Sequence, residues 1–100
     1  MRIYLFRNGE LKYKIGFTSR SIDKRMKEVQ TGSSSELTVA GEFESEYASR
    51  IETAMHNFYS AYNTSGEWFA LPEQEVVMFK ERARKMHENF RFLEESGNIW

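Results

Sequence analysis

The chain contains no cysteine, which excludes disulfide bonds and thiol chemistry. A zinc site would have to use carboxylates and the two histidines alone. No long apolar run follows Met1 or occurs later, so the sequence predicts neither a signal peptide nor a membrane span. We therefore expect a cytoplasmic protein with no membrane partner.

The length of 100 residues and the apolar share of 40% predict one domain over residues 1–100, with a modest core. The net charge of −1 argues neither for nor against a nucleic-acid partner. Its distribution is uneven, because residues 1–31 carry eight Lys and Arg against three acidic residues, and residues 32–75 carry one against eight. Either the first third presents a phosphate-attracting face, or the two segments neutralise each other across the fold.

Three segments have the composition of strands. Residues 2–7 and 11–17 are rich in aromatic and branched apolar side chains, and the Asn8-Gly9 pair between them predicts a hairpin with a two-residue type I′ turn. Residues 36–43 alternate apolar with polar or small side chains and predict a third strand. The segment 64–72 is interpreted as a turn and a short connection.

Three helices are expected between and after these strands. The first lies within residues 18–32, where Ser19 or Ser21 caps it and Gly32 ends it. The second covers residues 45–63, and the third covers residues 73–95 after Pro72. The order predicts an α+β fold: a three-stranded antiparallel sheet with flanking helices, in which a ββαβα core is followed by a C-terminal helix.

Four polar residues of the second expected helix are spaced four, three and four apart: Glu52, His56, Tyr59 and Asn63. That spacing places them on one stripe of a helix. A carboxylate, an imidazole, a phenol and an amide on one line offer oxygen and nitrogen ligands together with proton-transfer groups. The alternative is an ordinary polar boundary that keeps the helix soluble.

Two further positions could belong to a core or to a site. Because side chains alternate along a strand, Tyr13 points away from Lys14, and we expect one of them to be buried and the other to lie on the opposite surface. Arg25 lies beside Ile22 and Met26 on the first helix. It either extends along the edge of the core or points into a cleft to bind a phosphate in a fork.

The order of these features resembles the GIY-YIG nuclease superfamily. Residues 2–4 (RIY) stand where GIY would, and residues 14–16 (KIG) stand where YIG would. Arg25 lies nine residues after Gly16, Glu52 falls in the segment IETAMHNF, and GEWF follows at residues 66–69. The KIG variant and the GEWF segment are similar to the short phage and bacterial branch, and the resemblance covers about residues 2–70.

This resemblance implies a small metal-dependent endonuclease that hydrolyses DNA, in the cytoplasm of a bacterium or of a phage-infected host. It implies Mg²⁺ or Mn²⁺ held by Glu52. The expected catalytic residues are Tyr4, Lys14, Arg25, Glu52 and His56. We add four substrate-binding candidates: Tyr13, Arg20, Lys24 and Asn63.

Lys14 stands where the superfamily carries the tyrosine thought to activate the attacking water. Lys14 could do so only if neutral, which requires a pKa well below its ordinary value of about 10.4. Otherwise it holds the phosphate electrostatically, and Tyr4, Tyr13 or His56 takes the proton. His56 is the most attractive base, because the ordinary pKa of histidine is about 6.5.

Two other functions remain open at this stage. The chain could be a nucleic-acid-binding or interaction module that has kept the fold without efficient cleavage, or an inhibitor that binds another protein through its charged last helix. That helix has a seven-residue apolar repeat at Val76, Phe79, Ala83, Met86, Phe90 and Leu93. The repeat either packs within its own chain or forms a homodimer.

Overall fold

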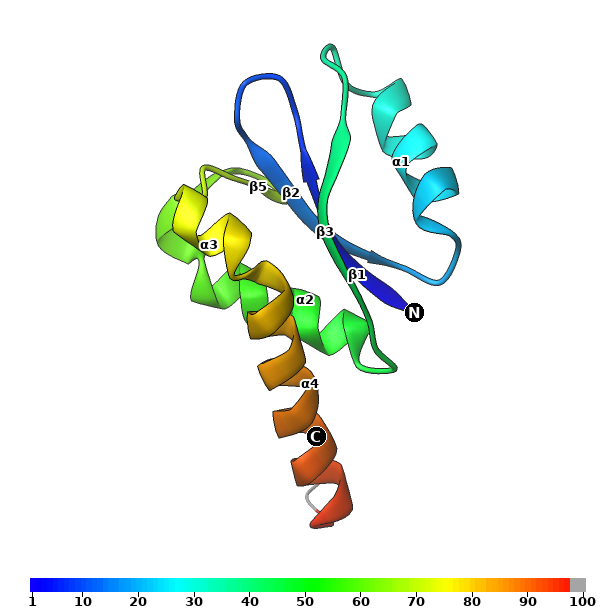
Figure 1. The fold of residues 1–100 in the computed structure, drawn as a ribbon, viewed down its shortest axis with the longest axis vertical. Helices are drawn as coiled ribbons and strands as arrows, with labels where there is room; N and C mark the ends of the chain where they lie inside the picture. The colour runs from blue at the N-terminus through cyan, green and yellow to red at the C-terminus, as the bar shows by residue number, and fades with distance from the viewer. Residues whose placement is uncertain (98–100) are drawn as a thin grey trace.

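The computed structural model describes residues 1–97, which form an antiparallel sheet with helices on both faces (Figure 1). The sheet has five strands in the order β3-β1-β2-β5-β4. Their bounds are Arg2–Arg7 (β1), Tyr13–Thr18 (β2), Thr38–Glu44 (β3), Asn63–Ser65 (β4) and Trp68–Phe69 (β5). The α+β class is confirmed, and the three-strand prediction is wrong. The strands β4 and β5 are too short to show an alternating pattern; β5 pairs with the free edge of β2, and β4 pairs in turn with β5.

The hairpin of β1 and β2 is confirmed, but its predicted turn is wrong. Residues 8–12 connect the strands, and the backbone N–H of Asn8 donates to the Lys12 carbonyl at 3.0 Å. The side-chain oxygen of Asn8 accepts from the N–H groups of Glu10 and Lys12, at 2.9 and 3.0 Å. Because Asn8 uses its side chain as a local acceptor, the loop closes over five residues, and the positive φ falls at Leu11 (58°) rather than at Gly9.

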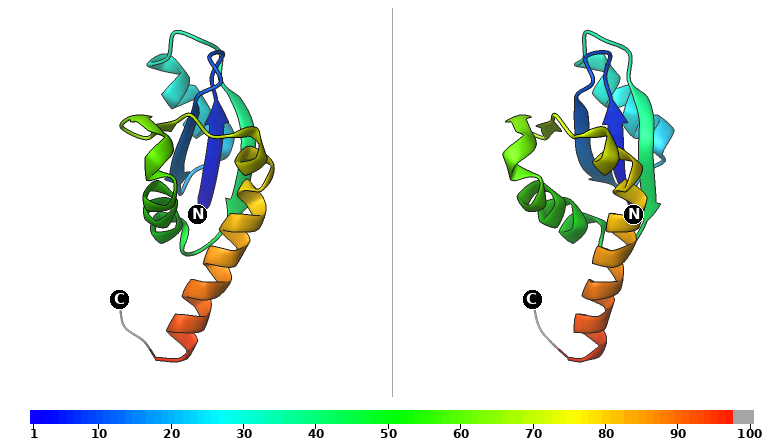
Figure 2. Two further views of the ribbon diagram at one scale, coloured as in Figure 1. Left: turned by 90° about the vertical axis from the view of Figure 1, so that its left-hand side faces the viewer. Right: turned by 60° about the vertical axis from the view of Figure 1, so that its left-hand side comes forward.

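The helices are α1 (Ile22–Thr31), α2 (Ala48–Phe58), the single turn η1 (Ser60–Tyr62), α3 (Glu73–Val77) and α4 (Phe79–Glu95). Ser21 caps α1 as expected, since its hydroxyl accepts from the N–H of Lys24 at 3.2 Å. Figure 2 shows α1 on one face of the sheet and α2 with α4 on the other. The sheet therefore separates two apolar layers.

Alternation along β1 supplies both layers. Ile3 and Leu5 face α2 and α4 in the larger core, whereas Tyr4 and Phe6 face α1 in the smaller one, beside Ile22. The rings of Tyr4 and Phe6 are stacked with their centroids 4.1 Å apart. This alternation sets Tyr4 on the α1 face of the sheet.

The second expected helix ends earlier than predicted, at Phe58, so the four-residue polar stripe is wrong beyond His56. Tyr59 turns into the core and donates its hydroxyl to Glu75 at 2.8 Å. Arg82 binds the same carboxylate through two N–H groups, at 2.6 and 3.0 Å. This cluster ties α3 and α4 to the end of α2.

The third expected helix is divided at Met78 into α3 and α4. In α4, Phe79 and Ala83 are buried against the sheet, while Phe92 near the other end is 65% exposed. Figure 1 shows this second half extending beyond the sheet. Within residues 1–97, no helix has both the length and the apolar character that a membrane crossing requires.

Candidate functional site

Three of the expected catalytic residues line one hollow of about 370 Å³, which we call the smaller hollow. Tyr4 comes from β1, Arg25 from α1 and Glu52 from α2. The complete lining is Tyr4, Phe17, Thr18, Ser19, Arg20, Arg25, Glu52 and Glu67. Residues far apart in the sequence therefore meet where α1 and α2 pass the end of β2.

Tyr4 and Arg25 are joined directly, because Nε of Arg25 donates to the Tyr4 hydroxyl at 3.1 Å. Burial raises the pKa of Tyr4 above its ordinary value, and the hydrogen bond from Arg25 partly opposes this. The same bond raises the pKa of Arg25, which stays charged. A protonated phenol and a fixed guanidinium thus stand side by side in the hollow.

Gly16 makes room for this pair. It lies opposite Tyr4 in the β1–β2 register, and a Cβ at Gly16 would come 2.3 Å from the Tyr4 hydroxyl oxygen. The phenol therefore lies across the position that any other side chain would occupy. Only glycine therefore fits at position 16 without displacing the Tyr4 phenol.

Glu52 brings a carboxylate to the opposite wall. Burial raises its pKa, and the charge of Glu67 adds to this, while His56, Lys14 and the Phe17 backbone act in the lowering direction. A half-buried carboxylate beside a second one favours a hard cation. Mg²⁺ commonly binds one or two carboxylates and completes its shell with waters and substrate phosphates, so the donor set fits such an ion. Residues 1–97 contain no cluster of three or more His, Cys, Asp or Glu side chains suited to a metal.

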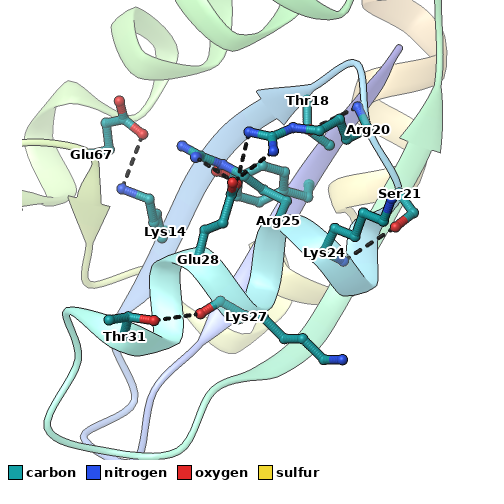
Figure 3. Close-up of polar contacts among 11 residues, drawn as sticks. Lys14, Thr18, Arg20, Ser21, Lys24, Arg25, Lys27, Glu28, Thr31 and Glu67 are labelled. Carbon is teal, nitrogen blue, oxygen red and sulfur yellow. Dashed lines mark hydrogen bonds and ion pairs between the residues drawn. The ribbon is translucent and has the colours of Figure 1, made fainter.

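Lys14 adjoins the smaller hollow through Glu67, with its Nζ 3.2 Å from a carboxylate oxygen (Figure 3). The same Nζ lies 5.8 Å from the centre of the Trp68 ring. This pairing fits the electrostatic role for Lys14 better than a role as a base. Glu67 was not among the site residues expected from the sequence. The signal for its position was the GEWF segment, whose Trp68 pairs with Lys14 between β5 and β2.

His56 does not line the smaller hollow. Its Nε2 lies 2.9 Å from the backbone carbonyl oxygen of Ile15, and its ring meets Phe69 edge-on. Because a carbonyl only accepts, Nε2 carries the proton in this bond, and only Nδ1 remains to accept one. Tyr13 is buried in the larger core, on the other face of the sheet from Lys14. This confirms the expected split between Tyr13 and Lys14 and places Tyr13 away from the smaller hollow.

The remaining three substrate-binding candidates lie in different parts of the structure. Arg20 lines the smaller hollow, and its guanidinium pairs with Glu28 at 2.8 and 3.1 Å. Lys24 is exposed on α1, outside the hollow. Asn63 donates its side-chain N–H groups to the Gly66 and Trp68 carbonyls and so holds the β4–β5 turn.

A second depression of about 630 Å³, the larger hollow, adjoins the first at Arg25, which lines both. Lys12 and Lys14 lie on its wall, together with Trp68 and Glu28. The linings of the two hollows together carry four positive side chains, Lys12, Lys14, Arg20 and Arg25, and four carboxylates, Glu10, Glu28, Glu52 and Glu67. The hollows thus offer guanidinium and ammonium groups that can bind phosphates, beside carboxylates that can hold a cation or pair with those groups.

The fold and the joined hollows define a small α+β protein with a tyrosine–arginine–carboxylate site suited to phosphate chemistry. The family model of the T5orf172 domain matches residues 1–84, and the chain belongs to this family. The family is nuclease-related, which indicates a nuclease-like or DNA-related function. No curated protein and no solved structure matches the chain.

Proposed function

We propose that the chain is a small metal-dependent endonuclease of the GIY-YIG type, which hydrolyses phosphodiester bonds of DNA in the cytoplasm of a bacterium or of a phage-infected host. The observation that carries this proposal is the convergence of Tyr4, Arg25 and Glu52 on the smaller hollow from three separate elements. Phosphodiester hydrolysis needs a positioned water, charge stabilisation on the phosphate oxygens and in-line geometry. The three side chains are of the types that supply these.

Arg25 binds a non-bridging phosphate oxygen in this mechanism. Its Nε is held by Tyr4, so the outer N–H groups are directed by a fixed anchor. Tyr4 accepts from Arg25 with one lone pair, which leaves its O–H and its second lone pair for a water. Because burial raises the pKa of Tyr4, we assign it to positioning the attacking water rather than to removing its proton.

Glu52 would hold Mg²⁺ or Mn²⁺, with Glu67 beside it. When bound, the cation would supply charge stabilisation on the phosphate. Lys14 adds positive charge from the adjoining wall, where Glu67 orients it. His56 anchors α2 to β2 through the Ile15 carbonyl, and we assign it to supporting Glu52 one helical turn away.

The second candidate is a DNA-binding module without efficient cleavage. The observation that favours it is Lys14, which stands at the position where the resemblance expects a tyrosine and is engaged by Glu67. Both candidates predict DNA binding, and only the first predicts strand scission.

A plasmid-nicking assay with Mg²⁺ or Mn²⁺ separates them, with EDTA as the metal-free arm. We expect wild-type protein to nick the plasmid only with the metal, and Glu52→Gln to abolish nicking. Glu73→Gln is the matched control, because it removes one carboxylate from the exposed start of α3. Binding in a gel shift with no nicking by any variant would favour the module, and nicking by Glu52→Gln at the wild-type rate would refute the assignment of Glu52.

A further inference from the structure

Glu28 occupies the space between two arginines of the proposed site. Figure 3 shows Arg20 and Arg25 both reaching the Glu28 carboxylate on α1. Arg20 places its two terminal nitrogens 2.8 and 3.1 Å from the two carboxylate oxygens, and Nη1 of Arg25 lies 3.5 Å from one of them. The two guanidinium groups thus converge on a single anion that belongs to the protein.

The position of this carboxylate is that of a ligand. A guanidinium binds carboxylates and phosphates through the same planar fork, so the atoms that hold Glu28 are those that would hold a phosphate. Arg20 lines the smaller hollow, Glu28 lines the larger one, and Arg25 lines both. Glu28 therefore stands where the two hollows meet, on the path of a phosphate chain that crosses from one to the other.

We propose that Glu28 is a place-holding carboxylate, which occupies a phosphate position in the free protein and is displaced by the substrate. The inference deepens the proposed function, because it takes DNA as the source of the phosphate. The side chain of Glu28 is 39% exposed and lies on the surface of α1, so it can swing away without disturbing the core. Arg25 keeps its bond to Tyr4 when Glu28 leaves, whereas Arg20 turns fully to the phosphate.

The displacement of Glu28 affects how tightly the site binds DNA. Exposed ion pairs are weak, so a DNA phosphate backed by its neighbours can replace Glu28, but the exchange lowers the net gain from binding. Glu28 also favours a polyanion over a single small anion, because an isolated phosphate has no further contacts with which to offset the lost ion pairs.

The test measures binding of a fluorescein-labelled DNA duplex by anisotropy, in EDTA so that no cleavage occurs. We expect Glu28→Gln to bind about fivefold more tightly than wild type, because the two arginines no longer exchange one anion for another. Glu10→Gln is the matched control. Glu10 lines the larger hollow and forms no ion pair with another residue among those described, so its removal changes the charge equally and should alter affinity less than twofold.

A second comparison asks whether the effect passes through Arg20. Arg20→Ala should weaken binding more in the Glu28→Gln background than in wild type, since Arg20 is free to bind phosphate only when Glu28 is absent. Equal or weaker binding by Glu28→Gln, equal tightening by Glu10→Gln, or no DNA binding by any of these proteins would overturn the inference. Tighter binding without metal-dependent nicking would support the place-holder and refute the nuclease, and nicking without tighter binding would do the reverse.

Discussion

Gly16→Ala is the substitution for which the structure makes its sharpest prediction. The new Cβ would lie 2.3 Å from the hydroxyl oxygen and 2.5 Å from Cζ of Tyr4, far inside van der Waals contact. The Tyr4 ring cannot shift freely, because it is fully buried and stacked on Phe6 at 4.1 Å. The phenol must therefore leave its present position, and its 3.1 Å bond with Arg25 goes with it.

The size of the effect follows from two consequences of the new Cβ: the interior becomes overpacked, and the Tyr4 hydroxyl is displaced. Overpacking a filled interior costs about 1–3 kcal/mol, which for a chain of this length lowers the melting temperature by roughly 5–20 °C. A displacement of about 1 Å at a reacting group costs about a hundredfold in rate. We therefore expect Gly16→Ala to lower both the melting temperature and, by about two orders of magnitude, the rate of metal-dependent nicking.

Two other glycines separate these effects. Gly41→Ala places a Cβ 2.8 Å from a ring carbon of Phe79 in the larger core, so it should lower the melting temperature while folded protein keeps its nicking rate. Gly9→Ala meets only Ser35, at an ordinary 3.5 Å, and should change neither. Melting is followed by circular dichroism, and nicking is measured well below each midpoint. A Gly16→Ala protein that nicks as fast as the Gly41→Ala protein would refute the reasoning.

Three further predictions test the site, the helix cluster and the last helix. Arg25→Lys should slow nicking more than tenfold, because lysine cannot keep a contact with Tyr4 while forming a two-point contact with phosphate; equal rates would show that only charge matters. Arg82 lowers the pKa of Glu75, so the stabilisation from this pair is present above the pKa of an unfolded glutamate and is lost as the pH falls through the lowered value. Glu75→Gln should therefore reduce the free energy of unfolding in urea by about 1–3 kcal/mol at pH 7. A gap to wild type that stays unchanged as the pH falls through the lowered pKa of Glu75 would contradict this. The exposed Phe92 should support a homodimer through α4. Light scattering at micromolar concentration should therefore give a dimer mass for wild type and a monomer mass for Phe92→Glu. A monomer mass for wild type would exclude the homodimer.

Much of the fold could be predicted from local patterns. The apolar composition of residues 2–7 indicated β1, the alternation in residues 36–43 indicated β3, and Ser21 with Gly32 marked the ends of α1. These signals are local, because a strand period and a helix cap depend on neighbouring residues alone. The strands β4 and β5 carried no such signal. They consist of three and two residues; β5 forms because β2 offers it an unpaired edge, and β4 pairs in turn with β5.

The candidate site residues Tyr4, Lys14, Arg25 and Glu52 came from the order of motifs that the resemblance supplied. Strand alternation predicted only that Lys14 points away from Tyr13. The Tyr59 and Asn63 positions could not be predicted by extending a helical period, because α2 ends at Phe58.

The sequence by itself determined which side chains the protein carries and on which face of each strand and helix they lie. Both depend only on residue type and on the period of the backbone. Only the tertiary structure decided which groups meet. It joined Arg25 to Tyr4 across 21 positions, and it brought Glu67 to Lys14 through the pairing of β5 with β2. It also set Glu28 between two arginines. Contacts of this kind depend on how helices pack across the sheet, and no local period of the chain specifies them.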